Sequence, residues 1–235
     1  MKKLLIIVIA AILALAACPT DGDSGGGSSL PKGIVMKTAK SGDVSIYLEG
    51  EDITINWGDK TALQEITGPF DNDIGHNYAD ATERTITITG VIYGLNCSSL
   101  ELKSLDVRAA KDLKELSCYE NSLTKLDVSR NTALVELYCQ NNYLESLNVS
   151  RNTKLVSLWC WHNYLESLDV SRNTALEVLD CLDNGMYAAA LNNLFKSLVD
   201  RKGKSEGYIY IGGNPGVAGC DQTIATGKNW VFGWY

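Results

Sequence analysis

The sequence has very little histidine: His76 and His162 are the only two in 235 residues. Neither has a serine or cysteine partner in an arrangement that nucleophilic catalysis would use. Histidine is also the commonest metal-binding side chain, and no histidine pattern here suggests a metal centre. We therefore expect no enzymatic activity, no bound metal and no cofactor.

The sequence also lacks an apolar run long enough to span a membrane as a permanent helix. The run from Leu4 to Ala17 is shorter than the ~20 residues that such a helix needs. Lys2 and Lys3 precede it and Cys18 follows it, which is the layout of a secretory signal. Residues 1–17 are therefore predicted to be a signal peptide, and the Gly- and Ser-rich residues 18–32 a flexible tether.

The end of this signal, Leu15-Ala16-Ala17-Cys18, resembles the lipobox of bacterial lipoproteins. The resemblance implies cleavage before Cys18, a diacylglyceryl group on its sulfur and an acyl chain such as palmitate on its new amine. Two or more acyl chains anchor a protein stably. We therefore expect the chain in the bacterial cell envelope, at the outer membrane and exposed on the surface, with the lipid as its only membrane contact. An ordinary cleaved signal with an incidental cysteine is the alternative.

Positive charge is scarce as well, because 21 Lys and Arg residues stand against 28 Asp and Glu residues. The net charge is −7, and removal of Lys2 and Lys3 with the signal peptide takes it to −9. An acidic surface disfavours nucleic acid and anionic lipid as partners.

The sequence is rich in one feature, an internal repeat. Cysteines recur every 21 residues, at Cys97, Cys118, Cys139, Cys160 and Cys181. A fixed period in this range is the signature of a solenoid, whose coils stack on their neighbours. The half-repeat Leu134-x-x-Leu137-x-Cys139-x-x-Asn142-x-Leu144 matches the leucine-rich-repeat consensus, with cysteine at an inward apolar position.

The repeat predicts one short strand per coil. Alternation along Leu137-Tyr138-Cys139 places Leu137 and Cys139 inside the coil and Tyr138 outside it. Stacked coils then form a parallel sheet, and we predict leucine-rich repeats over 86–185. One asparagine per coil is placed to satisfy backbone groups at the turn: Asn121, Asn142, Asn163 and Asn184.

Seven cysteines in an exported protein would ordinarily indicate disulfides. In-register side chains of a parallel sheet lie about 4.8 Å apart and point the same way, whereas a disulfide needs converging Cβ atoms about 3.8 Å apart. A linear file of thiols without histidine also cannot surround a zinc ion. The repeat cysteines are therefore predicted to be reduced and buried, and the state of Cys220 stays open.

Residues 33–85 differ from the repeats and alternate like β-strands, as at 44–48 and 53–57. Trp57-Gly58-Asp59 and His76-Asn77-Tyr78 resemble a shortened PKD-type β-sandwich, a fold that is immunoglobulin-like and usually non-enzymatic. The resemblance implies a small immunoglobulin-like β domain, which we expect also to cover the first end of the solenoid.

Residues 186–235 are predicted to form a C-terminal repeat and cap. The segment from Ile209 to Asn214 repeats the strand pattern, with Ile211 in the cysteine position. The extra length before it fits a helix from Tyr187 to about Leu198. Solenoid ends must be covered, and the apolar mass of this cap would come from Trp230, Phe232 and Trp234.

The cysteine file and the Ser-Arg-Asn-Thr segments at 129–132, 150–153 and 171–174 are most similar to internalin-J-type repeats of bacterial surface lipoproteins. The similarity covers about 86–216. It implies adhesion or partner binding at the cell surface, without a ligand common to the family.

The outward strand positions form the expected binding surface, because solenoids bind through their extended sheet face. Trp and Tyr anchor protein interfaces and also stack on sugar rings. The candidate partner-binding residues are Tyr119, Tyr138, Trp159, Trp161, Tyr208, Tyr210, Glu115, Glu136 and Asp180. We expect a lipid-anchored adhesin that recognises a protein of a host or neighbouring cell surface. Glycan binding by the same aromatic residues and an architectural envelope role are the alternatives.

Two charged patterns have simpler interpretations. Glu115 and Glu136 occupy the same position on adjacent coils and could bind an ion or hydrolyse a glycoside. No third acid joins them in that position, and we therefore favour a solvated pair. On the opposite half of each coil, acidic or amide residues and arginines are expected to compensate one another: Asp106, Asp127, Asn148, Asp169, Arg130, Arg151 and Arg172.

Overall fold

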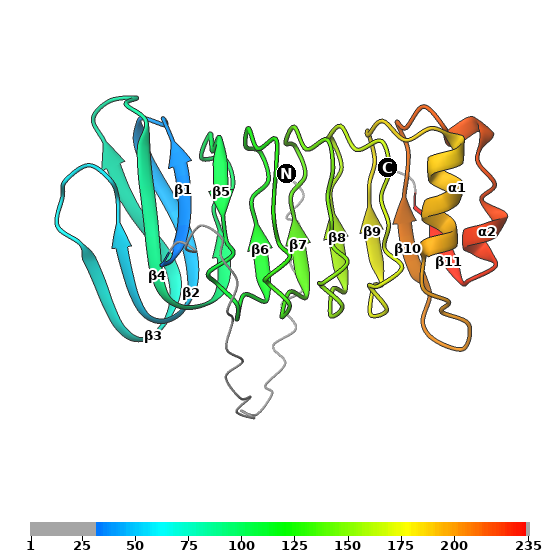
Figure 1. The fold of residues 1–235 in the computed structure, drawn as a ribbon, viewed down its shortest axis with the longest axis horizontal. Helices are drawn as coiled ribbons and strands as arrows, with labels where there is room; N and C mark the ends of the chain where they lie inside the picture. The colour runs from blue at the N-terminus through cyan, green and yellow to red at the C-terminus, as the bar shows by residue number, and fades with distance from the viewer. Residues whose placement is uncertain (1–31, 234–235) are drawn as a thin grey trace, which may run out of the picture.

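The computed structural model describes residues 32–233 of the chain. The predicted signal peptide, the lipidation site Cys18 and the aromatic residue Trp234 lie outside these residues. The described part is elongated, with an antiparallel β domain at one end, a row of stacked coils in the middle and helices at the other end (Figure 1). Within 32–233, no helix combines the length and the apolar character that crossing a membrane would require.

Four long strands build the N-terminal β domain: β1 (Ile34–Thr38), β2 (Gly42–Asn56), β3 (Gln64–Tyr78) and β4 (Arg84–Asn96). β2 pairs with β3 on one side and with β4 on the other, both antiparallel. The two strands expected at 44–48 and 53–57 are halves of β2. An irregularity in register between Glu51 and Ile53 separates them.

Hydrogen bonds join all four strands in one sheet, which continues into the solenoid. β4 crosses the boundary expected at residue 85: its start pairs with β1 and its end pairs with the first repeat strand, Leu95 opposite Leu116. The immunoglobulin-like resemblance therefore stays a prediction, and what the structure establishes is an antiparallel β domain that shares a strand with the first coil.

The middle of the molecule is a leucine-rich-repeat solenoid, as predicted. Each coil contributes one short strand, and successive strands pair parallel and in register. These strands are β6 (Glu115–Ser117), β7 (Glu136–Tyr138), β8 (Ser157–Trp159), β9 (Val178–Asp180) and β10 (Gly207–Tyr210). On the return half of the first full coil, β5 (Ser104–Asp106) pairs antiparallel with β1, so the β domain covers both halves of the first edge.

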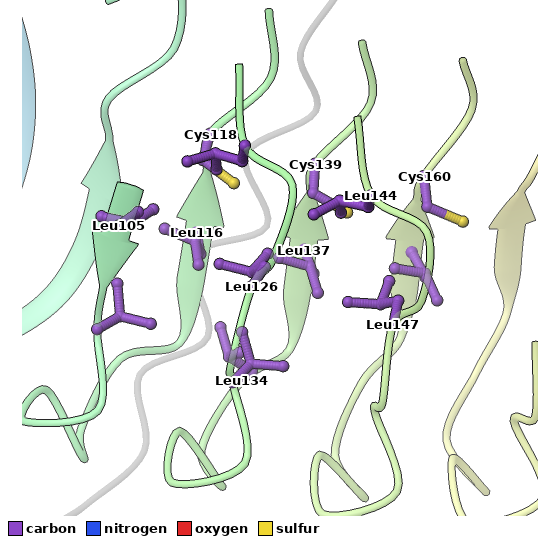
Figure 2. Close-up of a cluster of buried hydrophobic side chains, with 14 of the residues drawn as sticks. Leu105, Leu116, Cys118, Leu126, Leu134, Leu137, Cys139, Leu144, Leu147 and Cys160 are labelled. Atoms are coloured by element: carbon purple, nitrogen blue, oxygen red, sulfur yellow. The ribbon is translucent and has the colours of Figure 1, made fainter. Parts of the chain in front are cut away.

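The interior of the coils is a file of leucine and cysteine side chains. Leu116 and Leu137 enter from the strands, and Leu126 and Leu147 enter from the return halves (Figure 2). The five repeat cysteines are fully buried free thiols, as predicted. Burial disfavours the thiolate and raises the pKa of Cys139 to about 12, so the thiol stays protonated at neutral pH. Cys220 is also a free thiol, and it is only partly buried.

Two ladders of buried asparagine satisfy the backbone at the turns. Asn142 Nδ2 donates to the carbonyls of Cys118 and Cys139, at 3.0 and 3.2 Å, and its Oδ1 accepts from the Leu123 amide at 3.0 Å. The same contacts recur in the neighbouring coils. A second ladder at the other turn donates to carbonyls of the preceding coil: Asn131, Asn152 and Asn173. The predicted asparagine ladder is therefore confirmed.

Four elements cap the C-terminal end: α1 (Ala188–Ser197), a short 3-10 turn η1 (Val217–Gly219), α2 (Thr223–Thr226) and β11 (Trp230–Phe232). β11 extends the sheet beside β10. α1 buries Leu191, Leu194 and Phe195, the face that the sequence predicts. The Trp230 ring is 1% exposed and its Nε1 donates to the Val199 carbonyl at 2.8 Å. The predicted helical cap is therefore confirmed.

Candidate binding surface

The outward side chains of the parallel strands lie in three files, because every strand pairs in register with the next. The first file is Gly94, Glu115, Glu136, Ser157, Val178 and Tyr208. The second is Asn96, Ser117, Tyr138, Trp159, Asp180 and Tyr210. The third, two residues further along each coil, is Ser98, Tyr119, Gln140, Trp161, Leu182 and Gly212. We call these three files together the strand face.

The aromatic residues gather in the middle of the strand face. Tyr138 and Trp159 are neighbours in the second file, and their rings meet edge to face with centroids 5.5 Å apart and planes at 77°. The Tyr138 hydroxyl donates to the Glu136 carboxylate at 2.5 Å, which fixes the direction of both side chains. Both rings are half-buried, so each keeps part of its surface in solvent. The predicted aromatic residues on β7 and β8 therefore form one contiguous patch.

Trp161 extends this patch toward the turn that follows β8. Its ring meets that of His162 at 5.1 Å and 61°. His162 has a left-handed backbone, with φ at 49°, and this turn directs its ring back toward Trp161. His162 Nε2 lies 3.4 Å from a carboxylate oxygen of Asp183. The sequence pattern gave no indication of this contribution from His162.

The remaining predicted aromatic residues lie toward the two ends of the strand face. Tyr119 is half-buried and occupies the same file as Trp161, two coils earlier. Tyr208 is 44% exposed at the C-terminal end. Tyr210 packs against the backbone of Gly233, where a Cβ atom would lie only 1.9 Å from the ring. The patch thus extends over most of the solenoid, with Tyr138, Trp159 and Trp161 at its centre.

Glu115 and Glu136 are adjacent in the first file, as the sequence predicts, and a third carboxylate joins them. Glu49 of β2 is paired with Gly94, and its carboxylate lies over the space that a Gly94 side chain would fill. Partial burial raises the pKa of Glu115, and the charges of Glu136 and Glu49 raise it further. Within the file itself no third acid follows, as the sequence predicts, because Ser157 and Val178 occupy the next positions. Sequence reasoning missed Glu49 because its position depends on the pairing of β2 with β4.

Asp180 is placed differently from the exposed side chain that the sequence predicts. It is 2% exposed, between Trp159 of β8 and Tyr210 of β10 in the second file. Its carboxylate accepts a hydrogen bond from the Leu182 amide at 3.2 Å. Burial raises the pKa of Asp180 to about 6, and the nearby Asp183 carboxylate adds to the shift.

On the return halves of the coils, charge compensation forms by direct contact at Asp106, whose carboxylate lies 2.7 Å from the Arg108 guanidinium, whereas the acids of the later coils bond to turn amides. Asp127 accepts from the Ser129 amide at 3.0 Å, and Asn148 and Asp169 make the same turn contact in later coils. The arginines of these coils are exposed and, within residues 32–233, have no carboxylate within 4.0 Å: Arg130, Arg151 and Arg172. The acids prefer the backbone because a turn amide is fixed close to them, whereas an arginine side chain must be ordered first.

A second aromatic feature lies at the turn edge beside the strand face. Tyr143 and Tyr164 stack with ring centroids 6.0 Å apart and planes at 13°, and they are 48% and 59% exposed. They border a shallow hollow of about 370 Å³ that His162 and Asp183 also line.

Elsewhere, His76 lies 2.6 Å from an Asp59 oxygen and stacks on Trp57. Within the described residues, no three His, Cys, Asp or Glu side chains are grouped as a metal ion would require.

Comparison with known proteins finds similar solved structures. No family model matches the chain, and no curated protein matches it. The functional domain of InlJ from Listeria monocytogenes, which includes a cysteine ladder, is 28% identical with a TM-score of 0.40, over 57% of this chain and 37% of that chain. A leucine-rich-repeat protein from Leptospira interrogans is 20% identical with a TM-score of 0.44, over 54% and 32%. The matched region thus spans about a third of each of those two chains.

Proposed function

We propose that this leucine-rich-repeat protein is a binding protein that holds a protein partner on its strand face. The observation that carries the proposal is the contiguous patch of Tyr138, Trp159 and Trp161 at the centre of that face. Within residues 32–233, no helix or strand packs over β7 or β8 apart from the neighbouring strands. The patch is therefore open to a partner.

Aromatic side chains at this position are suited to anchoring an interface. Trp and Tyr are enriched among the few residues that supply most of the binding energy, and such residues cluster near the centre of an interface. The Tyr138 ring is already held by Trp159 and by Glu136, so little side-chain freedom is lost when a partner binds. Both arguments favour a rigid, preformed site over one that orders on binding.

The proposed setting is the bacterial cell surface. A lipid on Cys18 and a tether to residue 32 would hold the solenoid at the outer membrane, with the strand face free to meet a protein of a host or neighbouring cell. Support for this setting comes from the signal and lipobox pattern of residues 1–18. Mass spectrometry of the envelope fraction tests it: an N-terminal Cys18 with a diacylglyceryl group on its sulfur supports lipid anchoring, and an unmodified Cys18 thiol contradicts it.

A pair of matched double variants tests the strand face itself. The chain from residue 19, fused to a photo-cross-linker, is used to capture and identify a cell-surface protein, which is then purified for titration. We expect Trp159→Ala/Trp161→Ala to lose most of the affinity for that protein. The control is Tyr143→Ala/Tyr164→Ala, which also removes two solvent-facing rings but lies at the turn edge. Equal affinity of wild type and the tryptophan variant would reject the proposal.

Glycan binding is the second candidate, and the same aromatic residues favour it because flat rings stack on sugars. A glycan array separates the two candidates: saturable binding to a defined glycan that the tryptophan variant abolishes would favour the glycan. An architectural role predicts no saturable ligand in either assay.

A further inference from the structure

The strand face carries carboxylates and aromatic rings but no positive charge. None of its three files contains a lysine or arginine, whereas they contain Glu115, Glu136 and Asp180. Glu49 adds a fourth carboxylate at the N-terminal end, over Gly94. Lys114 directly precedes β6, and its ammonium lies 5.0 Å from the centre of the Tyr93 ring. The cations of the repeats are instead exposed on the return halves of the coils, as with Arg130 and Arg151.

Two of the polar groups on this face are buried hydrogen-bond acceptors beside aromatic rings. Gln140 is 7% exposed, in the same file as Tyr119 and Trp161, and its buried Oε1 has no hydrogen-bond partner within the described residues. Asp180 is 2% exposed between Trp159 and Tyr210, and its carboxylate accepts from the Leu182 amide at 3.2 Å. Burial of the Asp180 carboxylate disfavours its negative charge, so a positive charge placed over this part of the strand face would be favourable.

Glu115 and Glu136 extend this acceptor-rich character toward the first coils. Their backbones lie about 4.8 Å apart along the sheet, with Glu49 beyond them, and the charges of Glu136 and Glu49 raise the pKa of Glu115. A cation placed over them would relieve the repulsion among these charges. Aromatic ring faces next to carboxylates are the environment in which cation–π contacts and charge-assisted hydrogen bonds reinforce each other.

From this arrangement we infer that the protein partner of the strand face is recognised through a basic segment, whose arginine or lysine side chains lie against Trp159 and Trp161, carry their charge over Asp180, and donate to Glu136 and Glu115. The inference rests on the proposed function and adds the chemistry of its partner. Arginine fits better than lysine, because the planar guanidinium stacks on a ring and still offers donors at its edge. Acidic segments and anionic surfaces are disfavoured as occupants.

Peptide titration tests the inference without knowledge of the natural partner. The probes are synthetic peptides of about ten residues that alternate glycine with arginine, with lysine or with citrulline, the uncharged analogue of arginine. Isothermal titration of the chain from residue 19 at low salt should show binding in the order arginine, lysine, citrulline. The affinity for the arginine peptide should fall as salt rises, because the contact is electrostatic.

Variants with matched charge changes locate the site. Glu115→Gln/Glu136→Gln and, separately, Asp180→Asn should each weaken binding of the arginine peptide at least about fivefold. The control is Glu145→Gln/Glu166→Gln, which removes as many charges as Glu115→Gln/Glu136→Gln. Both control side chains are exposed and lie off the strand face. The control should change the affinity less than about twofold. Circular dichroism of each variant verifies that the fold is retained.

Three results would overturn the inference. The citrulline peptide could bind as tightly as the arginine peptide, the control variant could lose as much affinity as the strand-face variants, or the strand-face variants could bind with unchanged affinity. Concentration-dependent self-association that Glu115→Gln/Glu136→Gln abolishes would also overturn it, since the arginines of a second copy would then be the occupant. Failure here leaves the proposed function separately testable. If Trp159→Ala/Trp161→Ala still loses the captured surface protein, the strand face binds a partner that is not basic.

Discussion

At the scale of single residues, the meaning of cysteine in this chain comes from its position in the coil. One cysteine in every coil could indicate disulfides or a metal site. In the structure, each thiol instead takes the place of an apolar side chain in the narrow interior of the coil. Burial also raises the thiol pKa, so the nucleophilic thiolate is nearly absent at neutral pH. Chemistry at these cysteines is therefore suppressed by packing.

Thiol reactivity provides the first prediction. In native protein at pH 8, Cys220 should react with an aromatic disulfide reagent well before the repeat cysteines, because it is only partly buried. The five repeat thiols should become reactive only in denaturant. Fast labelling of a repeat cysteine, identified by mass spectrometry of the native sample, would contradict the buried ladder.

Asp180 provides the second prediction, through its pKa of about 6. The folded pKa is raised above the ordinary value of 3.8, so the folded state binds more protons between these two values, and stability falls as pH rises through that window. Asp183 and His162 are the titratable groups that also face this carboxylate. Asp180→Asn should therefore raise the free energy of unfolding at pH 7 by about 1–3 kcal/mol, with little gain below about pH 4.

Urea denaturation at pH 7 and pH 4 measures this difference. A variant that is more stable yet binds the arginine peptide more weakly would indicate a carboxylate kept for recognition at a cost in stability. Equal stability of wild type and Asp180→Asn at pH 7 would show that the buried charge is not destabilising.

At the scale of elements, the predictable part of the fold is the part that repeats. Periodicity predicted the strands around Leu116 and Leu137, the inward cysteines and the asparagine turns, because each position is set by contacts within one coil and its neighbour. The pairing of β2 with β4 depends on residues more than 30 positions apart, as with Glu49 opposite Gly94. No local pattern encodes that register, and for this reason the third carboxylate and the shared strand β4 were missed.

At the candidate site, the sequence likewise did not predict contacts between residues of different coils or contacts that depend on a turn. Trp159 and Trp161 could be assigned outward by alternation, but the burial of Asp180 depends on the large rings in adjacent coils. The contact of His162 with Trp161 depends on a left-handed turn. Sequence thus predicted which residues share the strand face, and the structure was needed for their contacts.

Gly207 of β10 provides the third prediction, at the junction of cap and solenoid. A Cβ atom there would lie 2.7 Å from the Trp230 ring and 2.8 Å from the Arg201 side chain. Gly207→Ala should therefore displace the cap and lower the free energy of unfolding by about 1–3 kcal/mol. Gly185→Ala is the control, since its Cβ atom would meet nothing closer than 3.5 Å. Equal stability of the two variants in urea would contradict the packing of Trp230 against β10.

At the scale of the whole molecule, the solenoid is closed at both ends. The β domain covers the first coil through β4 and β1, and α1, α2 and β11 cover the last. Each coil contacts only its neighbours, so an uncovered end exposes a full cross-section of leucine and cysteine. The strand face between the two caps is what remains available to a partner.

Truncation provides the fourth prediction. A chain that ends at residue 186 lacks the cap and exposes the apolar interior of the coil that contains Leu179 and Cys181. It should aggregate or elute as a large species in size-exclusion chromatography, while the chain from residue 19 to the end stays monodisperse. A monomeric, cooperatively folded truncated chain would contradict the role of residues 187–233 as a cap.

The central claim is that the strand face is the binding surface, and saturation binding to intact cells tests it most directly. Labelled chain from residue 19 is titrated as wild type, as Trp159→Ala/Trp161→Ala and as Tyr143→Ala/Tyr164→Ala. A central aromatic anchor contributes about 2 kcal/mol or more, so the loss of one such anchor in the tryptophan variant already weakens binding at least about thirtyfold, and the tyrosine variant should match wild type. Saturable binding of equal affinity in wild type and the tryptophan variant would contradict the account.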